Sequence, residues 1–177
     1  MKTKILAALV AVGAAQAAFA FDGTITFNGL ITPTTCTING GAGNDFAVEL
    51  PTVEHTAVDF NQIAGRTLFQ IVLTDCTPGS GSVHTYFEPI NSNIDTVTGY
   101  LQNTAASGAT NVEISLRNFD ESWIDLRAAD GGQNSKAMTI ASGGVVLQYY
   151  AEYQGVNNQL VQPGLVTSSV VYTLAYQ

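Results

Sequence analysis

The chain has 177 residues, of which 46% are hydrophobic and only 11% are charged, a composition typical of one folded domain rather than a disordered segment. Its 14 acidic residues outnumber its 6 basic residues and give a formal net charge of −8. This balance argues against nucleic acid as a partner, because phosphate binding needs clustered Lys and Arg. The two Cys and two His lack the close spacings of a zinc site, so neither a metal nor another cofactor is expected.

The N-terminus has the pattern of a secretory signal peptide. Two lysines precede an apolar run from Ile5 to Ala18, and Ala18-Phe19-Ala20 has the small-x-small form that signal peptidase recognises. The run is shorter than the ~20 residues that span a bilayer. We therefore expect residues 1–20 to be cleaved, with a retained anchor as the alternative. The sequence has no Asn-x-Ser/Thr acceptor, and export into a bacterial periplasm is the simplest context.

This context bears on the two cysteines, Cys36 and Cys76. In an oxidising compartment an isolated pair is predicted to form a disulfide, whereas two free buried thiols are the alternative. A bridge between them would close a loop of about 40 residues, which stabilises the fold by roughly 4 kcal/mol in the chain-entropy model.

The rest of the chain has an all-β pattern. Short apolar or alternating runs are separated by Gly- and Pro-containing turn strings, such as Asn39-Gly40-Gly41 and Pro78-Gly79-Ser80-Gly81. Strands at this spacing predict a sandwich or barrel in a single domain. The expected strands are Thr24–Ile31, Thr35–Ile38, Phe46–Leu50, Thr67–Leu73, Val83–Phe87, Val112–Leu116, Ala137–Ile140, Val145–Tyr153 and Val166–Tyr176.

The last of these segments has one apolar face and one small, mostly polar face, which is the period of a strand with one buried side. The apolar face carries Val166, Ser168, Val170, Tyr172, Leu174 and Tyr176. We expect no further strand beyond Gln177, so the outer edge of this strand would stay unpaired, which is hazardous for a long apolar strand.

The first segment after the signal also alternates. Ile25, Phe27, Gly29 and Ile31 fall on one face, and Thr24, Thr26, Asn28 and Leu30 on the other. It is either an ordinary first strand of the sheet or a strand that is offered to another molecule.

These motifs, taken in order, resemble those of the pilus subunits of the bacterial chaperone–usher family, specifically type 1 fimbrial pilins. The resemblance covers essentially the whole chain after the signal. It rests on Gly23 to Ile31 followed by Cys36, on Leu73-Thr74-Asp75-Cys76, on Ala105-Ala106-Ser107-Gly108 before Asn111-Val112-Glu113-Ile114, on Tyr149-Tyr150-Ala151-Glu152-Tyr153, and on a terminal strand with Gly164 before it and Tyr176 in the penultimate position.

The resemblance implies an incomplete immunoglobulin-like β-sandwich that lacks its final strand and is completed by a donor strand from a neighbouring subunit. Residues 21–32 would be the N-terminal donor extension and residues 33–177 the pilin domain. The implied donor positions are Gly23, Ile25, Phe27, Gly29 and Ile31. The implied acceptor groove, which also binds the chaperone, comprises Gly164, Val166, Val170, Tyr172, Leu174, Tyr176 and Gln177.

The implied partners are identical or homologous pilin subunits, a periplasmic chaperone and an outer-membrane usher. The implied location is an extracellular fimbria that supports cell adhesion and is reached through the periplasm. A secreted, self-contained β-sandwich that binds glycans or another adhesive target is the alternative function. A tip adhesin is disfavoured, because such proteins carry an additional receptor-binding domain.

We expect no enzymatic activity. A histidine with a carboxylate nearby could act as a general base, but no nucleophile motif accompanies His55 or His84. We therefore expect both histidines to be structural or exposed. Asp120, Glu121 and Asp125 lack the order of a calcium loop and are read as a solvated turn. A sugar-stacking role for Tyr149, Tyr150 and Tyr153 is possible by composition, but alternating core and surface positions account for them.

Overall fold

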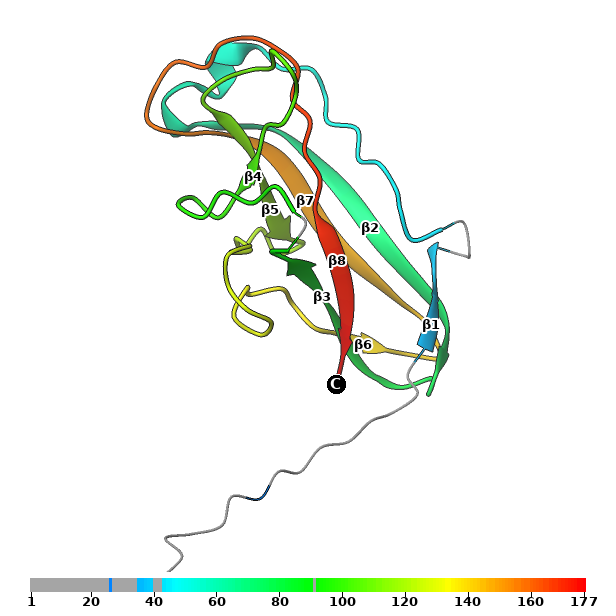
Figure 1. Cartoon of the computed structure of the whole chain (residues 1–177). Coiled ribbons are helices and arrows are strands. Elements are labelled where there is room, and N and C mark those ends of the chain that lie inside the picture. Colours follow the sequence, from blue (N-terminus) through cyan, green and yellow to red (C-terminus); the bar gives the residue numbers. More distant parts are fainter. Residues whose placement is uncertain (1–25, 27–34, 40–42, 91) are drawn as a thin grey trace, which may run out of the picture. The chain divides into compact units, whose positions relative to one another are not determined.

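A computed structural model describes Thr26 and residues 35–39, 43–90 and 92–177, and shows two antiparallel sheets (Figure 1). The larger sheet has the order β1-β2-β7-β5-β4 and the smaller has the order β6-β3-β8. The strands are β1 (Thr35–Ile38), β2 (Ile63–Thr77), β3 (Gly81–Glu88), β4 (Leu101–Gln102), β5 (Val112–Asn118), β6 (Met138–Ile140), β7 (Val145–Gly155) and β8 (Val171–Tyr176), with short 3-10 helices η2 (His55–Ala57) and η3 (Asp59–Asn61) between β1 and β2.

The centre of the larger sheet is the pair formed by β2 and β7, which runs from Ile63 opposite Gln154 to Leu73 opposite Val145. The register shifts between Ala64 and Thr67. Gly65 lies in this bulge with φ +70°, and a Cβ there would come within 2.7 Å of the Tyr153 ring. Glycine is therefore needed both for the backbone conformation and for the close approach of the two strands.

The main core lies between the two sheets. Along β7, Leu147, Tyr149 and Ala151 are buried, as expected for every second residue of a strand with one face on the core. The buried cluster is completed by Ile71, Leu73, Cys76, Val83, Phe87, Leu101, Leu116, Ile124, Leu126 and Ile140.

The outer face of the larger sheet carries a buried carboxylate, Glu152, which accepts hydrogen bonds from Arg66 Nε at 2.7 Å, from Arg117 Nε and from Ser115. Burial acts to raise the pKa of Glu152, but the bonds from Arg117 and Arg66 outweigh it and lower this pKa. Arg66 also reaches Glu121 at 2.8 Å. Two of the few basic side chains are thus used to neutralise one buried acid.

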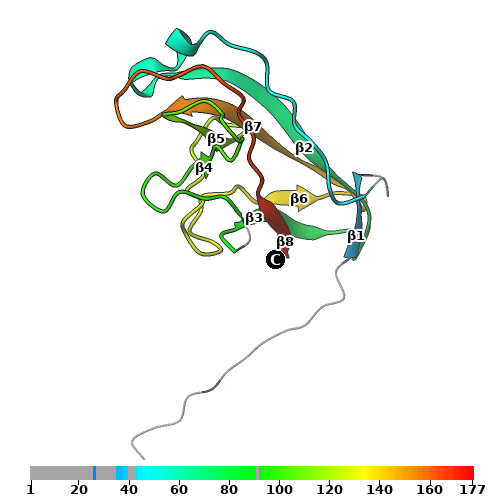
Figure 2. The same cartoon turned by 45° about the horizontal axis from the view of Figure 1, so that its top comes forward.

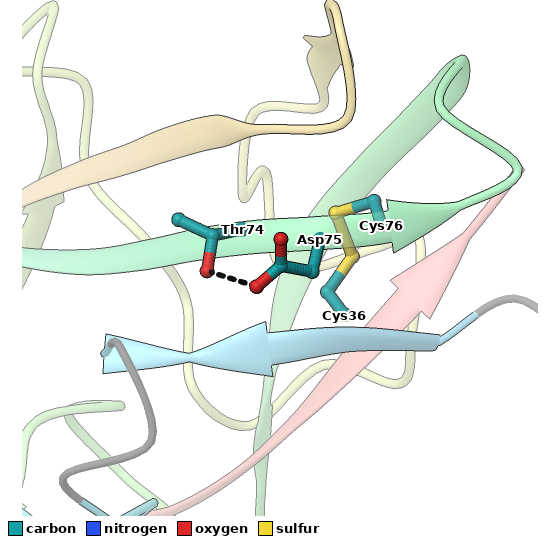
Figure 3. The surroundings of a disulfide bond; sticks show 4 residues. All are labelled: Cys36, Thr74, Asp75 and Cys76. Carbon is teal, nitrogen blue, oxygen red and sulfur yellow. Dashed lines mark hydrogen bonds between the residues drawn. A yellow bond between two sulfur atoms is a disulfide. The ribbon is translucent and has the colours of Figure 1, made fainter.

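The disulfide between Cys36 on β1 and Cys76 on β2 is present in the structure (Figure 3). The two strands pair as Thr35 opposite Thr77 and Thr37 opposite Thr74, with a bulge between these pairs. The bridge thus fastens the short edge strand β1 to the long strand β2, in agreement with the sequence prediction.

Two predicted strands are absent or shortened by several residues in the structure. Phe46–Leu50 is extended but pairs with no strand among the described residues, and the strand predicted for Val166–Tyr176 begins only at Val171. Both segments keep the alternating burial that suggested strands. The sequence pattern reports which face is buried, whereas a strand also needs hydrogen-bonded neighbours, and these two segments lie on either side of a gap.

Candidate functional site

A cavity of about 870 Å³ lies between residues 44–50 and the C-terminal segment 166–176. Its lining is mainly apolar and comes from both sheets as well as from these two walls. The floor includes Phe69, Ile71, Phe87, Leu101, Ile114, Leu116 and Ala151. In Figures 1 and 2, β8 (red) and the long segment that precedes β2 (cyan) run as two separate stretches of chain. We call this cavity the groove.

One edge of the groove is formed by unpaired backbone. Gln177 exchanges both hydrogen bonds with Ser82, and hydrogen-bonded pairs recur at every second residue of an antiparallel ladder. Residues 175, 173 and 171 of β8 therefore face β3, which leaves the N–H and C=O groups of Tyr172, Leu174 and Tyr176 directed toward the groove.

The segment before β8 continues this alternation. Thr167 C=O accepts the Thr104 N–H at 2.8 Å, Ser169 C=O accepts the Asn93 N–H at 3.3 Å, and Thr167 N–H donates to the Asn103 side chain at 2.9 Å. The backbone groups of Val166, Ser168 and Val170 have no such partner among the residues that the structure describes. The groove edge is therefore one continuous row of even-numbered residues from 166 to 176.

The structure places five of the seven predicted acceptor residues, Val166, Val170, Tyr172, Leu174 and Tyr176, along the groove. Their side chains are only half-buried, although they carry the apolar face of the segment. The other two lie beside it. A Cβ on Gly164 would meet the Ala109 nitrogen at 2.4 Å, so this glycine permits close backbone packing, and Gln177 ends the ladder with β3.

Tyr172 reaches across the groove from one wall to the other. Its hydroxyl donates to the Asn44 carbonyl at 2.8 Å, and its ring contacts Phe46 edge-on with centroids 6.2 Å apart. Burial, and secondarily the charge of Asp45, raises the pKa of Tyr172. Burial likewise raises the pKa of Tyr176 and of Tyr153. The phenols that line the groove are therefore neutral at physiological pH.

Ser168 is the polar interruption in the acceptor face. Its hydroxyl oxygen is buried and has no hydrogen-bond partner among the described residues, and the residue lines the groove. A buried hydroxyl is favourable only when it finds a hydrogen-bond partner.

The wall formed by residues 44–50 was not anticipated as part of the site. The available signal was the alternation of Phe46, Val48 and Leu50, which was read as a strand of the sheet. Val48 and Leu50 pack against the core, while Phe46 is 41% exposed at the groove mouth. The predicted donor positions Gly23, Ile25, Phe27, Gly29 and Ile31 lie outside the described residues; Thr26, between them, is exposed.

The remaining chemical candidates are separate from the groove. His84 is buried and bonds Asp130 at 2.7 Å, linking β3 to a loop, while His55 lies 4.0 Å from Asp59 near the sandwich end. Glu121 pairs with Arg66 and Asp125 with Arg127. Among the residues that can be described, no three His, Cys, Asp or Glu side chains converge as metal ligands.

The three tyrosines of β7 alternate between the core side and the outer face of the sheet, as predicted. In addition, one of them lines the groove. Tyr149 is buried in the core, and Tyr150 lies on the outer face, where its ring stacks on Phe119 with centroids 5.9 Å apart. Tyr153 is half-buried and lines the groove. They therefore do not form one platform.

Comparison with solved structures shows the fold. The chain aligns with a subunit of a chaperone–usher pilus over 92% of its own length and 100% of the other chain, with a TM-score of 0.60 and 19% identity. It aligns with the P pilus rod subunit PapA over 82% and 100%, with a TM-score of 0.57 and 18% identity. These likenesses confirm the incomplete immunoglobulin-like sandwich. Within the described part of the chain, no helix has the length and apolarity needed to span a membrane.

Sequence comparison identifies the family. The chain is 47% identical to the major fimbrial subunit SMF-1 of Stenotrophomonas maltophilia, over 90% of this chain and 95% of that protein. It is 39% identical to the F17 fimbrial protein of Escherichia coli, over 99% of each. A family model described as type-1 fimbrial protein, A, matches residues 50–177. The chain therefore belongs to the type-1 fimbrial protein family and is a structural fimbrial subunit.

Proposed function

We propose that this subunit polymerises by strand exchange, in which residues 21–31 of one copy fill the groove of the next. The observation that carries the proposal is the continuous free edge from Val166 to Tyr176 beside an 870 Å³ apolar cavity. Addition of a strand at such an edge satisfies the backbone groups and buries alternate side chains at once.

The alternation of inward-facing residues in the donor and acceptor segments supports this pairing. Even-numbered residues of the acceptor direct both their backbone groups and their side chains to the groove. A donor strand would present Ile25, Phe27 and Ile31 on its own apolar face. Residues opposite each other in a sheet point to the same face, so odd-numbered donor residues would pair with even-numbered acceptor residues. Every strand pair in the described sandwich is antiparallel, and we propose the same direction for the donor.

The energetics explain why partners are needed before assembly. Burial of Ile25, Phe27 and Ile31 at ~1.5–3 kcal/mol each contributes roughly 5–9 kcal/mol before entropy costs. A whole domain is stable by only ~5–15 kcal/mol. A subunit with an empty groove is thus marginal, and it exposes an apolar edge that favours aggregation.

We therefore infer that a periplasmic chaperone first occupies the groove and that an outer-membrane usher hands the subunit to the growing fibre. Export through the periplasm into an extracellular fimbria that supports adhesion belongs to the same proposal. We also propose that His55 and His84 have structural rather than catalytic roles in this subunit.

The test is a deletion of residues 21–31 compared with the unaltered chain. Material sheared from cells is run on gels in detergent with and without boiling. The unaltered chain should give a heat-sensitive ladder of multimers. The deletion variant should form no ladder, but it should still bind a synthetic peptide of residues 21–31 and be stabilised in its folded form by that peptide. Unfolding of the deletion variant even in the presence of the peptide would contradict the proposal, because it would make the segment part of its own sheet.

A further inference from the structure

The two ends of the sandwich carry different surfaces, which we define first. The tip comprises residues 54–63, 105–112 and 155–165, which are joined by backbone bonds such as Val156 to Asn111, Phe60 to Gln159 and Ala109 to Leu165. The base comprises Thr35, residues 77–82, residues 141–144 and Gln177, which are joined by the Thr35–Thr77 pair and the Gly143–Gly79 and Ser82–Gln177 bonds. The acceptor row runs from the tip at Val166 to the base at Tyr176 (Figure 1).

We propose that the tip of each subunit docks on the base of the next copy, making an end-to-end contact in addition to the exchanged strand. This inference rests on the proposed function, from which the direction of the donor is taken. An antiparallel donor has Ile31 near the acceptor's tip. Three residues separate Ile31 from Thr35 on the donor's base, and a chain of this length can reach at most about 14 Å at ~3.3–3.6 Å per residue. The short connection brings the donor's base to the acceptor's tip.

The tip has apolar side chains that the folded subunit leaves in solvent. Leu165 is 75% exposed beside the point where the donor would leave the groove, and Phe60 and Leu160 are 54% and 53% exposed. Phe60 also has left-handed backbone angles, φ 52° and ψ 47°. Such angles are unfavourable for a bulky residue, and strained residues concentrate at binding sites. These features fit a surface that is covered in the assembled state.

The charge distribution fits contact between two identical acidic molecules. The base segments 77–82 and 141–144 contain no charged residue, and neither do the tip segments 105–112 and 155–165. In the remaining tip segment Asp59 is buried and accepts the Val161 N–H at 2.7 Å, while Glu54 stays exposed. A chain with net charge −8 would repel a second copy through most surfaces, whereas most segments of these two ends bring no charged side chain to the contact.

The test introduces charge at the tip and restores complementarity at the base. Leu165→Asp places a negative charge on the tip, and Ser80→Lys places a positive charge on the base of the same chain. Because one chain supplies both surfaces, the double variant has opposite charges at every contact. Val97→Asp is the matched control, since Val97 is 80% exposed and belongs to neither end. The readout is the rate at which unboiled multimers of the full-length chain dissociate at a fixed raised temperature.

We expect Leu165→Asp multimers to dissociate about tenfold faster, as when one interface anchor is lost, with the rate restored in the double variant and unchanged in the control. If Leu165→Asp matches Val97→Asp, or if Ser80→Lys gives no rescue, the inference is wrong while strand exchange stands. Failure of the unaltered chain to form a ladder would overturn strand exchange itself, and the inference with it. Leu160→Asp replaces Leu165→Asp if the latter subunit loses its monomer melting transition.

Discussion

Truncation of Phe27 should weaken the fibre far more than truncation of its neighbour Thr26. Phe27 belongs to the donor face that we assign to the groove, whose floor includes the aromatic rings of Phe69 and Phe87. Phe→Ala in a packed interior costs ~3–5 kcal/mol. The groove is open on one side, so we take the lower value, about 3 kcal/mol, which corresponds to roughly a hundredfold change in the equilibrium between joined and separate subunits. Thr26→Ala removes a side chain from the opposite face and should change this equilibrium little.

The assay is the temperature at which multimers disappear in detergent, together with their dissociation rate at one fixed temperature. Phe27→Ala should lower the first and raise the second, and Thr26→Ala should match the unaltered chain. Equal effects of both changes would show that the segment does not enter as a strand with one buried face. A larger effect of Thr26→Ala would place the opposite set of donor residues in the groove.

Three further outcomes follow from other parts of the molecule. Gly29→Leu should slow or block polymerisation, measured as ladder formation over time, because a large side chain is added at a position of the donor face that carries none; normal polymer would contradict this. Burial, and then the charge of Asp95, raises the pKa of Glu113, so the stability that this group contributes is complete below its unfolded pKa and is lost as pH rises. Glu113→Gln should therefore melt a few degrees higher than the unaltered subunit at pH 7 and equally near pH 3; a lower melting temperature at pH 7 would refute this. Replacing Cys36 and Cys76 together with Ser should cost roughly 4 kcal/mol in urea unfolding, given the separation of 40 residues; an unchanged midpoint would show that packing alone holds β1.

The sequence predicted the parts of the fold that depend on local alternation. β7 was expected over Val145–Tyr153 and is observed over Val145–Gly155, because its core-facing side chains Leu147, Tyr149 and Ala151 recur at every second position. β4 has only two residues and leaves no such pattern. Contacts between distant residues were also out of reach. Arg66 and Glu152 are 86 positions apart, and nothing in the composition of either segment indicates that the bulge in β2 brings them together.

The acceptor half of the site was predicted better than the wall that faces it. Val166 to Tyr176 has a face that is apolar at five of its six positions, and the groove follows it. The same reasoning made Phe46–Leu50 an ordinary strand. An alternating pattern cannot distinguish a strand that is paired in a sheet from an extended segment that lines the groove, because both bury one face. Only the arrangement of partners, with Tyr172 bonded to Asn44 across the groove, separates the two cases.

The sheet edges also account for a linear polymer rather than a network. Among the described strands, three of the four edge strands are short: β1 has four residues, β4 two and β6 three. Short edges offer little template for another chain. The edge at β8 is extended by the unpaired row back to Val166, so it can accept a whole donor segment. If each chain supplies one donor and one long edge, and these lie on different parts of the molecule, the contact is heterologous, and such contacts build an open filament unless the rotation between subunits closes a ring. Subunits joined in this way add head to tail.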